Sequence, residues 1–259
     1  MKGRLLVIDG LDGSGKATQV ALLHEYLTNH SVTNFAVDFL RYGKESCVMV
    51  EKYLNGSFGT DPFATDPYTA SMFYTIDRSI SYKAEKWGKM YENGYLIVSD
   101  RYTSSNIIHQ GSKLFKGGCA LIDVLSRRPE FVNFVKWIYE TEYIKIGLPK
   151  PDIIINLYLS DEANRRMIKR RREENQDRNN NDIHETNFEY LNQCRSIMDA
   201  YRILIGDSYT KTHYGLNDVL KGIVHEFIRV DDPITHEPRP REDILNDIIS
   251  VVKKYNLMG

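Results

Sequence analysis

The sequence lacks long hydrophobic runs and contains few cysteines. Its longest aliphatic runs, Leu5–Ile8 and Ile153–Ile155, are far shorter than the roughly 20 residues of a transmembrane helix, and too short for a signal-peptide core. Its three cysteines, at positions 47, 119 and 194, are too scattered to form a disulfide framework or a zinc site. We therefore expect a cytoplasmic protein with no membrane segment.

The charges of the chain nearly cancel. Lysine and arginine number 34 and aspartate and glutamate 35, so the formal net charge of −1 gives no overall attraction to nucleic acid or to an acidic membrane. Hydrophobic residues make up 42% and charged residues 27%, as is ordinary for a folded globular protein. Because no repeat or linker divides the 259 residues, we expect a single domain over residues 1–259.

Short apolar runs alternate with segments of helical periodicity. Strands are predicted at 4–9, 34–39, 95–99, 153–159 and 224–230, and helices up to residue 29, at 66–93, from 161, from 187 past 201, and at 240–255. Asp66-Pro67 is typical of a helix start, with aspartate as N-cap and proline at the first helical position. This alternation predicts an α/β fold with a mostly parallel sheet covered on both faces.

A glycine-rich segment, GLDGSGK at Gly10–Lys16, lies between the first strand and its helix. It matches the phosphate-loop pattern G-x-x-x-x-G-K in the required context. The glycines let backbone N–H groups turn toward one point, the helix N-terminus adds positive potential, and Lys16 can reach the terminal phosphates of a nucleotide. The alternative is a glycine-rich turn with an accidental lysine, which the spacing disfavours.

The last position of this pattern is altered. Ala17 stands where a serine or threonine hydroxyl normally contacts Mg²⁺, and Thr18 lies roughly 100° further around the helix. A metal ion would then be held by phosphate oxygens, waters and the carboxylates of Asp9, Asp12 or Asp100. Asp100 follows the third strand and can sit beside the phosphate loop. Its alternative role is the N-cap of the next helix.

Three motifs occurring in one order resemble the thymidylate kinase family of P-loop nucleoside monophosphate kinases: Gly10–Thr18, the run YTIDR at Tyr74–Arg78, and DRY at Asp100–Tyr102. Arg41-Tyr42-Gly43, Pro151-Asp152 and the lid-like Asp182–Glu185 also fit, and the resemblance spans roughly residues 4–205. It implies a P-loop NTPase-like three-layer sandwich with a five-stranded parallel sheet. It also implies ATP as donor, dTMP as acceptor, Mg²⁺ as cofactor, and a homodimer.

The resemblance also implies site residues. ATP would be bound by Gly10, Leu11, Asp12, Gly13, Ser14, Gly15, Lys16, Ala17, Thr18, Arg170 and Arg178. The acceptor dTMP would be bound by Asp12, Arg41, Tyr42, Tyr74, Arg78, Arg101, Ser105, Asn106 and His109. The catalytic residues would be Lys16, Arg101, Asp100 and Asp12, and the metal candidates Asp9, Asp100 and Glu185.

In the base pocket, the resemblance implies that Tyr74 stacks on thymine and that Arg78 bonds to the base. Residues four apart share a helix face, which permits this pair. Tyr74 alone would more often be a core aromatic. The apolar stripe beside the pair, Phe73, Ile76 and Ile80, is expected to point into the core.

In the rest of the acceptor site, Arg101 would bind the phosphate with Arg41 nearby. Asp12 would contact the 3′-hydroxyl or the metal shell, and Ser105 and Asn106 would line the base pocket. His109 stands where the family leads us to expect a tyrosine near the 2′ position of the sugar. It could equally be a helix residue packed beneath the site.

The densest positive cluster is Arg165, Arg166 and Lys169–Arg172, and it leads into the polar stretch Glu173–Asn181, which is expected to be an exposed loop. A solvated helix face is the usual explanation of such a cluster, and nucleic-acid binding is another. We favour a lid at about 170–185 that brings arginines to the phosphates and excludes water.

The expected reaction needs no general base, because a phosphate monoester is already ionised near neutral pH. The nearest rival, a deoxynucleoside kinase, needs a carboxylate at the end of the second strand, where Arg41 stands with Glu45 as the next acid. A second rival is a catalytically impaired nucleotide-binding regulator, which only Ala17 supports. Residues 112–150 and 206–224 are longer than in compact family members and receive no role.

Overall fold

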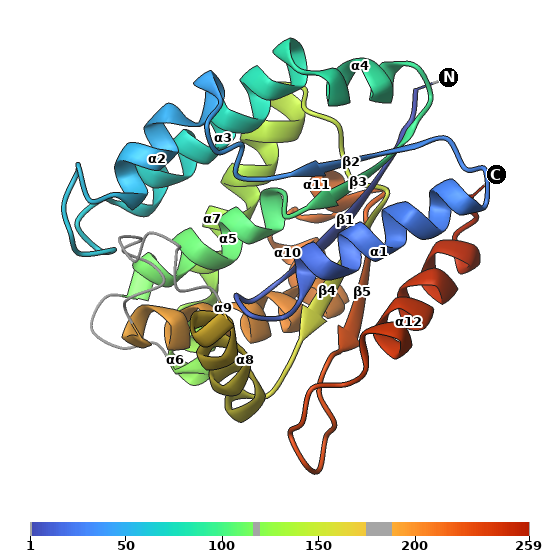
Figure 1. Cartoon of the computed structure of the whole chain (residues 1–259). Helices are drawn as coiled ribbons and strands as arrows, with labels where there is room; N and C mark the ends of the chain where they lie inside the picture. The colour runs from blue at the N-terminus through green and yellow to red at the C-terminus, as the bar shows by residue number, and fades with distance from the viewer. Residues whose placement is uncertain (1, 116–119, 175–187, 259) are drawn as a thin grey trace.

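The computed structural model describes residues 2–115, 120–174 and 188–258. In this part of the chain, five strands form one sheet in the order β2-β3-β1-β4-β5 (Figure 1). Their bounds are β1 (Arg4–Gly10), β2 (Asn34–Asp38), β3 (Leu96–Asp100), β4 (Ile153–Tyr158) and β5 (Val224–Arg229). Every neighbouring pair is parallel, so the predicted five-stranded parallel sheet is confirmed.

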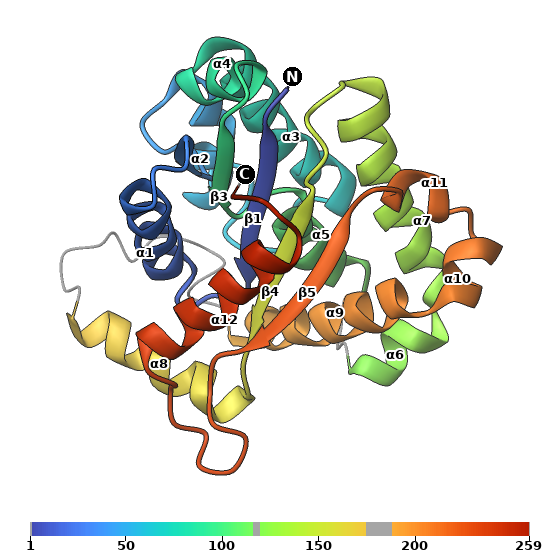
Figure 2. The same cartoon turned by 90° about the vertical axis from the view of Figure 1, so that its right-hand side faces the viewer.

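Helices cover both faces of the sheet, and the alternation of residues along β1 shows how. Leu6 and Ile8 pack with α1 (Lys16–Asn29) and α12 (Arg241–Lys254) on one face, while Leu5 and Val7 face the core shared with α5 (Thr103–Gly111), α7 (Arg128–Tyr139) and α9 (Phe188–Gly206). Figure 2 shows α12 in front of the strands and α1 beside them. A strand buried on both faces is typical of parallel sheets in three-layer α/β folds.

The other elements complete the outer layers. They are η1 (Glu45–Cys47), α2 (Val48–Leu54), α3 (Pro67–Ala84), α4 (Lys86–Glu92), η2 (Ser112–Phe115), α6 (Leu121–Ser126), the π-helical turn η3 (Glu140–Lys145), α8 (Asp161–Glu174), α10 (Ser208–His213) and α11 (Asn217–Leu220). The described parts of the long segments 112–150 and 206–224 thus fold largely into short helices. No helix in the described ranges is long and apolar enough to cross a membrane.

The helix predicted over 66–93 is wrong in its extent. Asp66 does cap α3, accepting hydrogen bonds from the backbone N–H groups of Tyr68 and Thr69. The chain then leaves the helical conformation at Glu85 and restarts as α4. A Cβ at Gly88 would lie only 1.8 Å from the Tyr82 carbonyl oxygen. Only glycine therefore lets the chain fold back so closely on the end of α3.

The expected orientation of α3 is also wrong. Ile76 and Ile80 are 37% and 45% exposed, and Phe73 is only partly buried. The polar residues Ser71 and Thr75 are buried instead. Helix α3 packs its polar face toward α5, because that interface contains hydrogen-bonding groups rather than an apolar core.

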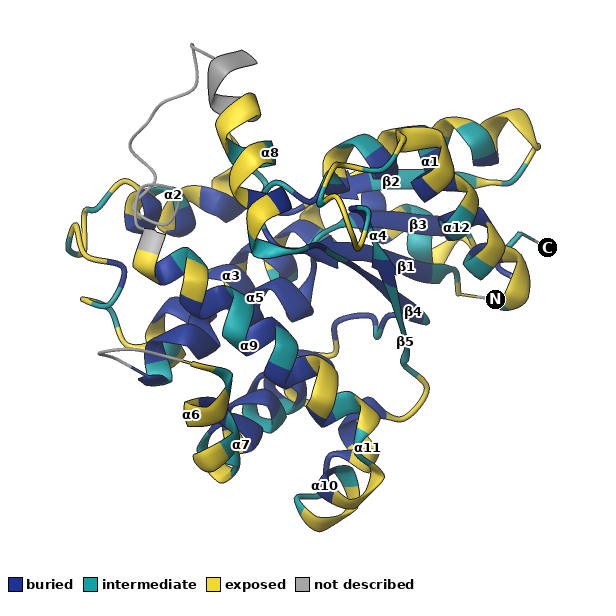
Figure 3. Cartoon of the chain, turned by 90° about the horizontal axis from the view of Figure 1, so that it is seen from below, coloured by how far each residue is buried: buried dark blue, intermediate teal, exposed yellow. Residues whose placement is uncertain are grey.

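The polar stretch Glu173–Asn181 was expected to be a loop, but α8 continues through Glu174. The remainder of the stretch lies outside the described residues. Figure 3 shows the outer surface of α8 as exposed, whereas the three central strands β3, β1 and β4 are almost entirely buried.

Candidate active site

The phosphate-loop segment joins β1 to α1 with three glycines at positive φ: Gly10 at 144°, Gly13 at 83° and Gly15 at 85°. A Cβ at Gly10 would lie 2.2 Å from the Leu157 carbonyl oxygen, so the loop lies directly against β4. Gly15 is the N-cap of α1 and supplies no side-chain acceptor to the first turn. The N–H groups of that turn remain available to an anion, as phosphate binding requires.

Lys16 folds back over this loop. Its Nζ donates hydrogen bonds to the carbonyl oxygens of Gly10 at 3.0 Å and Leu11 at 2.8 Å. Burial, together with the neighbouring charge of Arg101, lowers the pKa of Lys16 to about 8. The ammonium group is therefore held at the loop but sits close to losing its proton above neutral pH.

Asp12 is the centre of a charged cluster at the mouth of the loop. Arg101 donates to Asp12 Oδ1, Lys16 Nζ lies 4.0 Å from the same oxygen, and His109 Nε2 lies 4.0 Å from Oδ2. Although burial opposes it, the charges of Arg101, His109 and Lys16 hold the pKa of Asp12 well below its usual range. The predicted residues Asp12, Lys16, Arg101 and His109 thus lie together.

Arg101 is placed here by β3. Its backbone N–H donates to the Ile8 carbonyl oxygen of β1 at 3.0 Å, and its φ is 66°, a region that residues other than glycine seldom adopt. Such backbone strain is found mainly where the surrounding structure fixes a functional side chain. The guanidinium thereby reaches the loop from the carboxyl edge of the sheet.

His109 lies at the edge of the charged cluster and is packed against α9. It faces Asp12, and it also packs beneath the site, with its ring stacked on Tyr190 at 6.2 Å and its Nδ1 3.7 Å from Cys194 Sγ. Burial lowers its pKa to about 4, so the imidazole is neutral at physiological pH.

Two of the three proposed metal carboxylates can be located, and they differ. Asp9 is fully buried and accepts hydrogen bonds from Gly10 N–H and from the hydroxyls of Ser104 and Ser105. Both oxygens of Asp9 thus already accept hydrogen bonds within the protein, and Ser105 is directed toward Asp9. Asp9 therefore positions the loop. Glu185 lies outside the described residues.

Asp100 is arranged differently. Its Oδ1 is buried without a hydrogen-bond partner among the described residues, and burial raises its pKa despite the charges of Arg101 and Lys16. It does not cap α5, whose N-cap is Tyr102 and whose first turn has no side-chain cap. The described residues contain no group of three or more side chains suited to hold a metal ion. Asp100 can therefore contribute one ligand to a cation held mainly by phosphates and water.

The α3–α5 interface contains the predicted base-pocket residues. Tyr74 is mostly buried and packs edge-on against Tyr53 at 6.3 Å. Asn106 Nδ2 donates to the Ser71 carbonyl oxygen at 3.3 Å, while its Oδ1 is buried without a partner in the described part of the chain. Arg78 forms a buried ion pair with Glu142. The interface thus contains the aromatic ring of Tyr74, the Oδ1 acceptor of Asn106 and the positive charge of Arg78.

Arg41 and Tyr42 lie at the end of β2. The Arg41 guanidinium pairs with Glu85 and Asp38, and Tyr42 is exposed. On α1, Ala17 is exposed and Thr18 partly so, and Arg170 is exposed on α8. Arg178 lies outside the described residues.

No sequence pattern indicated the contacts that Glu142 and Asn164 make. Asn164 of α8 donates to the Asp12 carbonyl oxygen, and a Cβ at Gly13 would meet its Nδ2 at 3.3 Å. Helix α8 therefore packs directly on the phosphate loop. Neither residue belongs to a motif. The only sequence signal is that Asn164 is an uncharged polar residue beside the arginines of α8.

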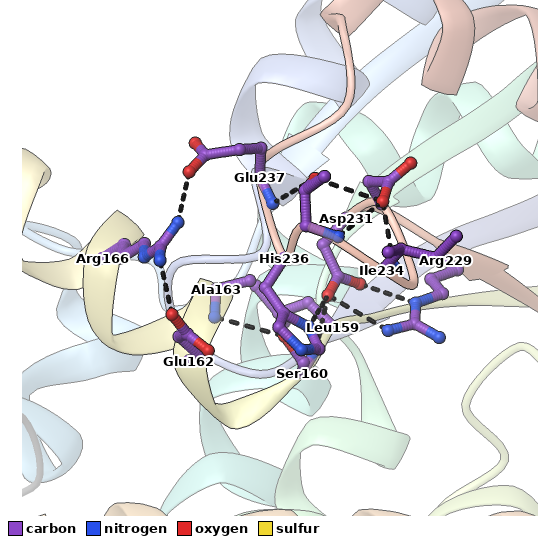
Figure 4. A network of polar contacts seen from close by, with 12 residues as sticks. Leu159, Ser160, Glu162, Ala163, Arg166, Arg229, Asp231, Ile234, His236 and Glu237 are labelled. Carbon is purple, nitrogen blue, oxygen red and sulfur yellow. Dashed lines mark hydrogen bonds and ion pairs between the residues drawn. The ribbon is translucent and has the colours of Figure 1, made fainter.

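A further network anchors the start of α8 (Figure 4). Asp231, after β5, accepts from Ser160 N–H at 3.1 Å and from Arg229 Nε at 2.9 Å. Although burial opposes it, these hydrogen bonds lower the pKa of Asp231 to about 2. Arg166 bridges Glu162 of its own helix and Glu237 of the loop after β5. The base of α8 is thereby fixed to the loop that leads into α12.

Comparison with known proteins gives consistent matches. The family model described as thymidylate kinase matches residues 8–211. A probable thymidylate kinase of Pyrobaculum aerophilum is 27% identical over 196 residues, covering 76% of this chain and 80% of that protein. The thymidylate kinase of Mycobacterium tuberculosis is 24% identical over 160 residues, 61% of this chain and 67% of that protein.

A solved structure is also similar. The thymidylate kinase from Candida albicans superimposes with a TM-score of 0.65 at 18% identity, covering 100% of this chain and 94% of that one. At this identity the likeness shows the fold, and the P-loop NTPase-like sandwich expected from the sequence is confirmed.

Proposed function

The chain belongs to the thymidylate kinase family, and from this premise we propose that it transfers the γ-phosphoryl group of ATP to dTMP, forming dTDP and ADP. The observation that carries the proposal is the cluster at the loop mouth, where Lys16 and Arg101 both lie within 4.0 Å of Asp12. One cation belongs to the phosphate loop and the other to the end of the neighbouring strand. Two phosphorylated ligands can therefore meet between them.

The reaction requires the protein mainly to align the two substrates and to supply positive charge. The phosphate of dTMP has a second pKa of about 6, so its attacking oxygen is already ionised and no general base is required. Lys16 would exchange the carbonyl oxygens of Gly10 and Leu11 for phosphate oxygens of ATP, and Arg101 would bind the acceptor phosphate. Both charges would then lie where negative charge develops in the transition state.

We propose the α3–α5 interface as the site of the thymine base. Tyr74 supplies the ring for stacking, Arg78 a donor, and Asn106 Oδ1 an acceptor for the N–H of thymine. Arg41 and Tyr42 would lie at the phosphate end. His109, neutral and beside Asp12, would contact the sugar together with Asp12.

The residues present fit Mg²⁺, since Asp100 Oδ1, which has no hydrogen-bond partner in the described ranges, is the kind of oxygen that this cation prefers. When bound, Mg²⁺ neutralises charge on the donor phosphates. Asp100 would hold it directly or through water, with phosphate oxygens supplying the ligands that Ala17 cannot.

Asp100→Asn is expected to raise the Mg²⁺ concentration needed for half-maximal rate, because one negative charge near the ion is removed. Its melting temperature should stay close to that of the unaltered protein, because Asp100 caps no helix. Ala17→Ser should lower the midpoint or leave it unchanged. A Mg²⁺ titration of steady-state rates measures this, with Asp247→Asn on α12 as control. An unshifted midpoint in Asp100→Asn contradicts the metal role.

We propose a lid at about 170–185, entered through the basic end of α8. The solvated-face explanation accounts for two members of the cluster, since Arg165 pairs with Asp161 and Arg166 with Glu162 and Glu237. Arg170 is exposed near the end of α8, and we include it among the arginines that would reach the phosphates of ATP. Cleavage by a protease within 170–185 should slow when ATP and dTMP are both bound, and equal rates would argue against closure.

We also propose a homodimer, supported by the apolar residues that α3 and the adjoining α2 leave exposed. They are Val48, Met49, Ile76 and Ile80. A second copy of the chain would remove them from water. Light scattering that reports the mass of a single chain at micromolar concentration would rule this out. The single domain and the cytoplasmic location stay predictions.

The rival functions gain no support from the structure. Arg41 follows β2, and Glu45, the acid that the rival function would use, is exposed on η1. The buried carboxylate nearby, Asp77, accepts hydrogen bonds from the Arg41 N–H and the Ser46 hydroxyl. ADP release with and without dTMP tests the proposal. Release that depends on dTMP supports the kinase, while tight ATP binding without release indicates a binding protein.

A further inference from the structure

Glu142 and Arg78 form a fully buried ion pair between elements far apart in the sequence. Arg78 of α3 is 2% exposed and Glu142 of η3 is 0% exposed. The carboxylate meets the side of the guanidinium, with Nε at 3.0 Å from Oε2 and Nη2 on Oε1. Burying two charges is costly, and such a pair is often no more stabilising than apolar residues of the same volume. Its presence therefore suggests a role other than stability.

The position of the carboxylate is fixed from several directions. The Thr75 hydroxyl of α3 lies 2.8 Å from Oε1, and the Thr103 hydroxyl of α5 donates to Oε2 at 2.6 Å. Glu142 itself lies in a π-helical turn, a rare conformation that is frequent at functional sites. The guanidinium can therefore adopt only one orientation against Glu142.

Three consecutive residues link this pair to the phosphate end of the site. Arg101 contacts Asp12 of the loop, the ring of Tyr102 lies 5.8 Å from the Arg78 guanidinium carbon, and Thr103 binds Glu142. The orientation of Arg78 is thereby set relative to the place where the acceptor phosphate would bind.

The other edge of the guanidinium, which carries Nη1, is not used by Glu142. Glu142 takes Nε and one Nη2 hydrogen, and no hydrogen bond among the described residues uses Nη1. A guanidinium can only donate. An uncharged base meets such an edge well if it presents a carbonyl oxygen there, as thymine and uracil do at position 4, and badly if it presents the amino group of cytosine.

We propose that Glu142 is a positioning residue that fixes the direction of the Nη1 edge of Arg78, and that it thereby makes the acceptor site select a pyrimidine with a carbonyl oxygen at position 4 over one with an amino group. This inference rests on the proposed function. It assigns a role to the long segment 112–150, which supplies Glu142 to a site otherwise built from α3 and α5.

Glu142→Gln tests the inference through selectivity. Without the carboxylate, Arg78 is no longer held in one orientation, so KM for dTMP should rise about tenfold or more while KM for ATP stays unchanged. The ratio of kcat/KM for dTMP to that for dCMP should fall by at least about tenfold. Glu140→Gln is the matched control, since Glu140 lies on the same turn, is half-exposed, and pairs only with Lys136 at 3.8 Å among the described residues.

A second variant keeps the test decisive if Glu142→Gln does not fold. Thr103→Val keeps the carboxylate charge but removes one of its donors, and should lower the dTMP-to-dCMP ratio in the same direction by a smaller factor. An unchanged ratio in whichever variant folds overturns the inference, even if stability falls. Failure of the unaltered protein to phosphorylate dTMP would instead overturn the proposed function, so the two failures are distinguishable.

Discussion

Lys16→Ala is expected to lower kcat by about a hundredfold or more. The substitution removes the positive charge that would stabilise the negative charge developing on the transferred phosphoryl group. The backbone of the loop should persist, since its path depends on the glycines at positions 10, 13 and 15. Steady-state ADP release measures the change, with Lys136→Ala on α7 as a control that should retain full activity. Near-normal turnover in a folded Lys16→Ala protein would refute the assigned role.

The same lysine predicts a pH dependence. Its pKa is lowered to about 8, so the side chain is mainly charged below that pH and neutral above it. The value of kcat/KM for ATP, which reports on ionisations of the free enzyme, should therefore fall as pH rises through about 8. Lys16→Arg, however slow, should lack this decline. A profile for the unaltered protein that is flat up to about pH 9 contradicts the prediction.

Arg101→Ala should lower kcat/KM for dTMP by about a hundredfold or more, because the acceptor phosphate loses its principal cation. The backbone strain at φ 66° is the same for alanine as for arginine. The substitution should therefore not change the stability of the protein through the backbone.

Arg101→Lys serves as the comparison, since it keeps the charge but loses the planar fork of donors. It should be impaired less than Arg101→Ala. Equal activity of Arg101→Ala and the unaltered protein, at unchanged melting temperature, would show that the acceptor phosphate binds elsewhere.

The parts of the site carried by local sequence were predictable. The loop Gly10–Lys16 contains its own backbone requirements, and the run Asp100–Tyr102 sits at a strand end, so the sequence places Lys16, Asp12 and Arg101 near one another. Parallel strands direct their carboxyl ends to one edge, which the order of β1 and β3 confirms.

The parts carried by tertiary contacts were not predictable. Asp9 lies near the end of a buried strand, and the hydroxyls that donate to it come from Ser104 and Ser105, more than 90 residues away. Periodicity identified an apolar stripe on α3 without showing that α5 offers polar partners to the opposite face. Glu142 belongs to no motif, and only the packing of η3 shows its ion pair.

The central claim is that this site phosphorylates a thymidine nucleotide. Rates of ADP release with saturating ATP and Mg²⁺, compared for dTMP, dCMP, AMP and GMP as acceptors, test it most directly. We predict that dTMP gives the highest kcat/KM of the four. A clear preference for AMP or GMP would contradict the assignment of Tyr74, Arg78 and Asn106 to a pyrimidine base, while leaving the fold and the phosphate loop intact.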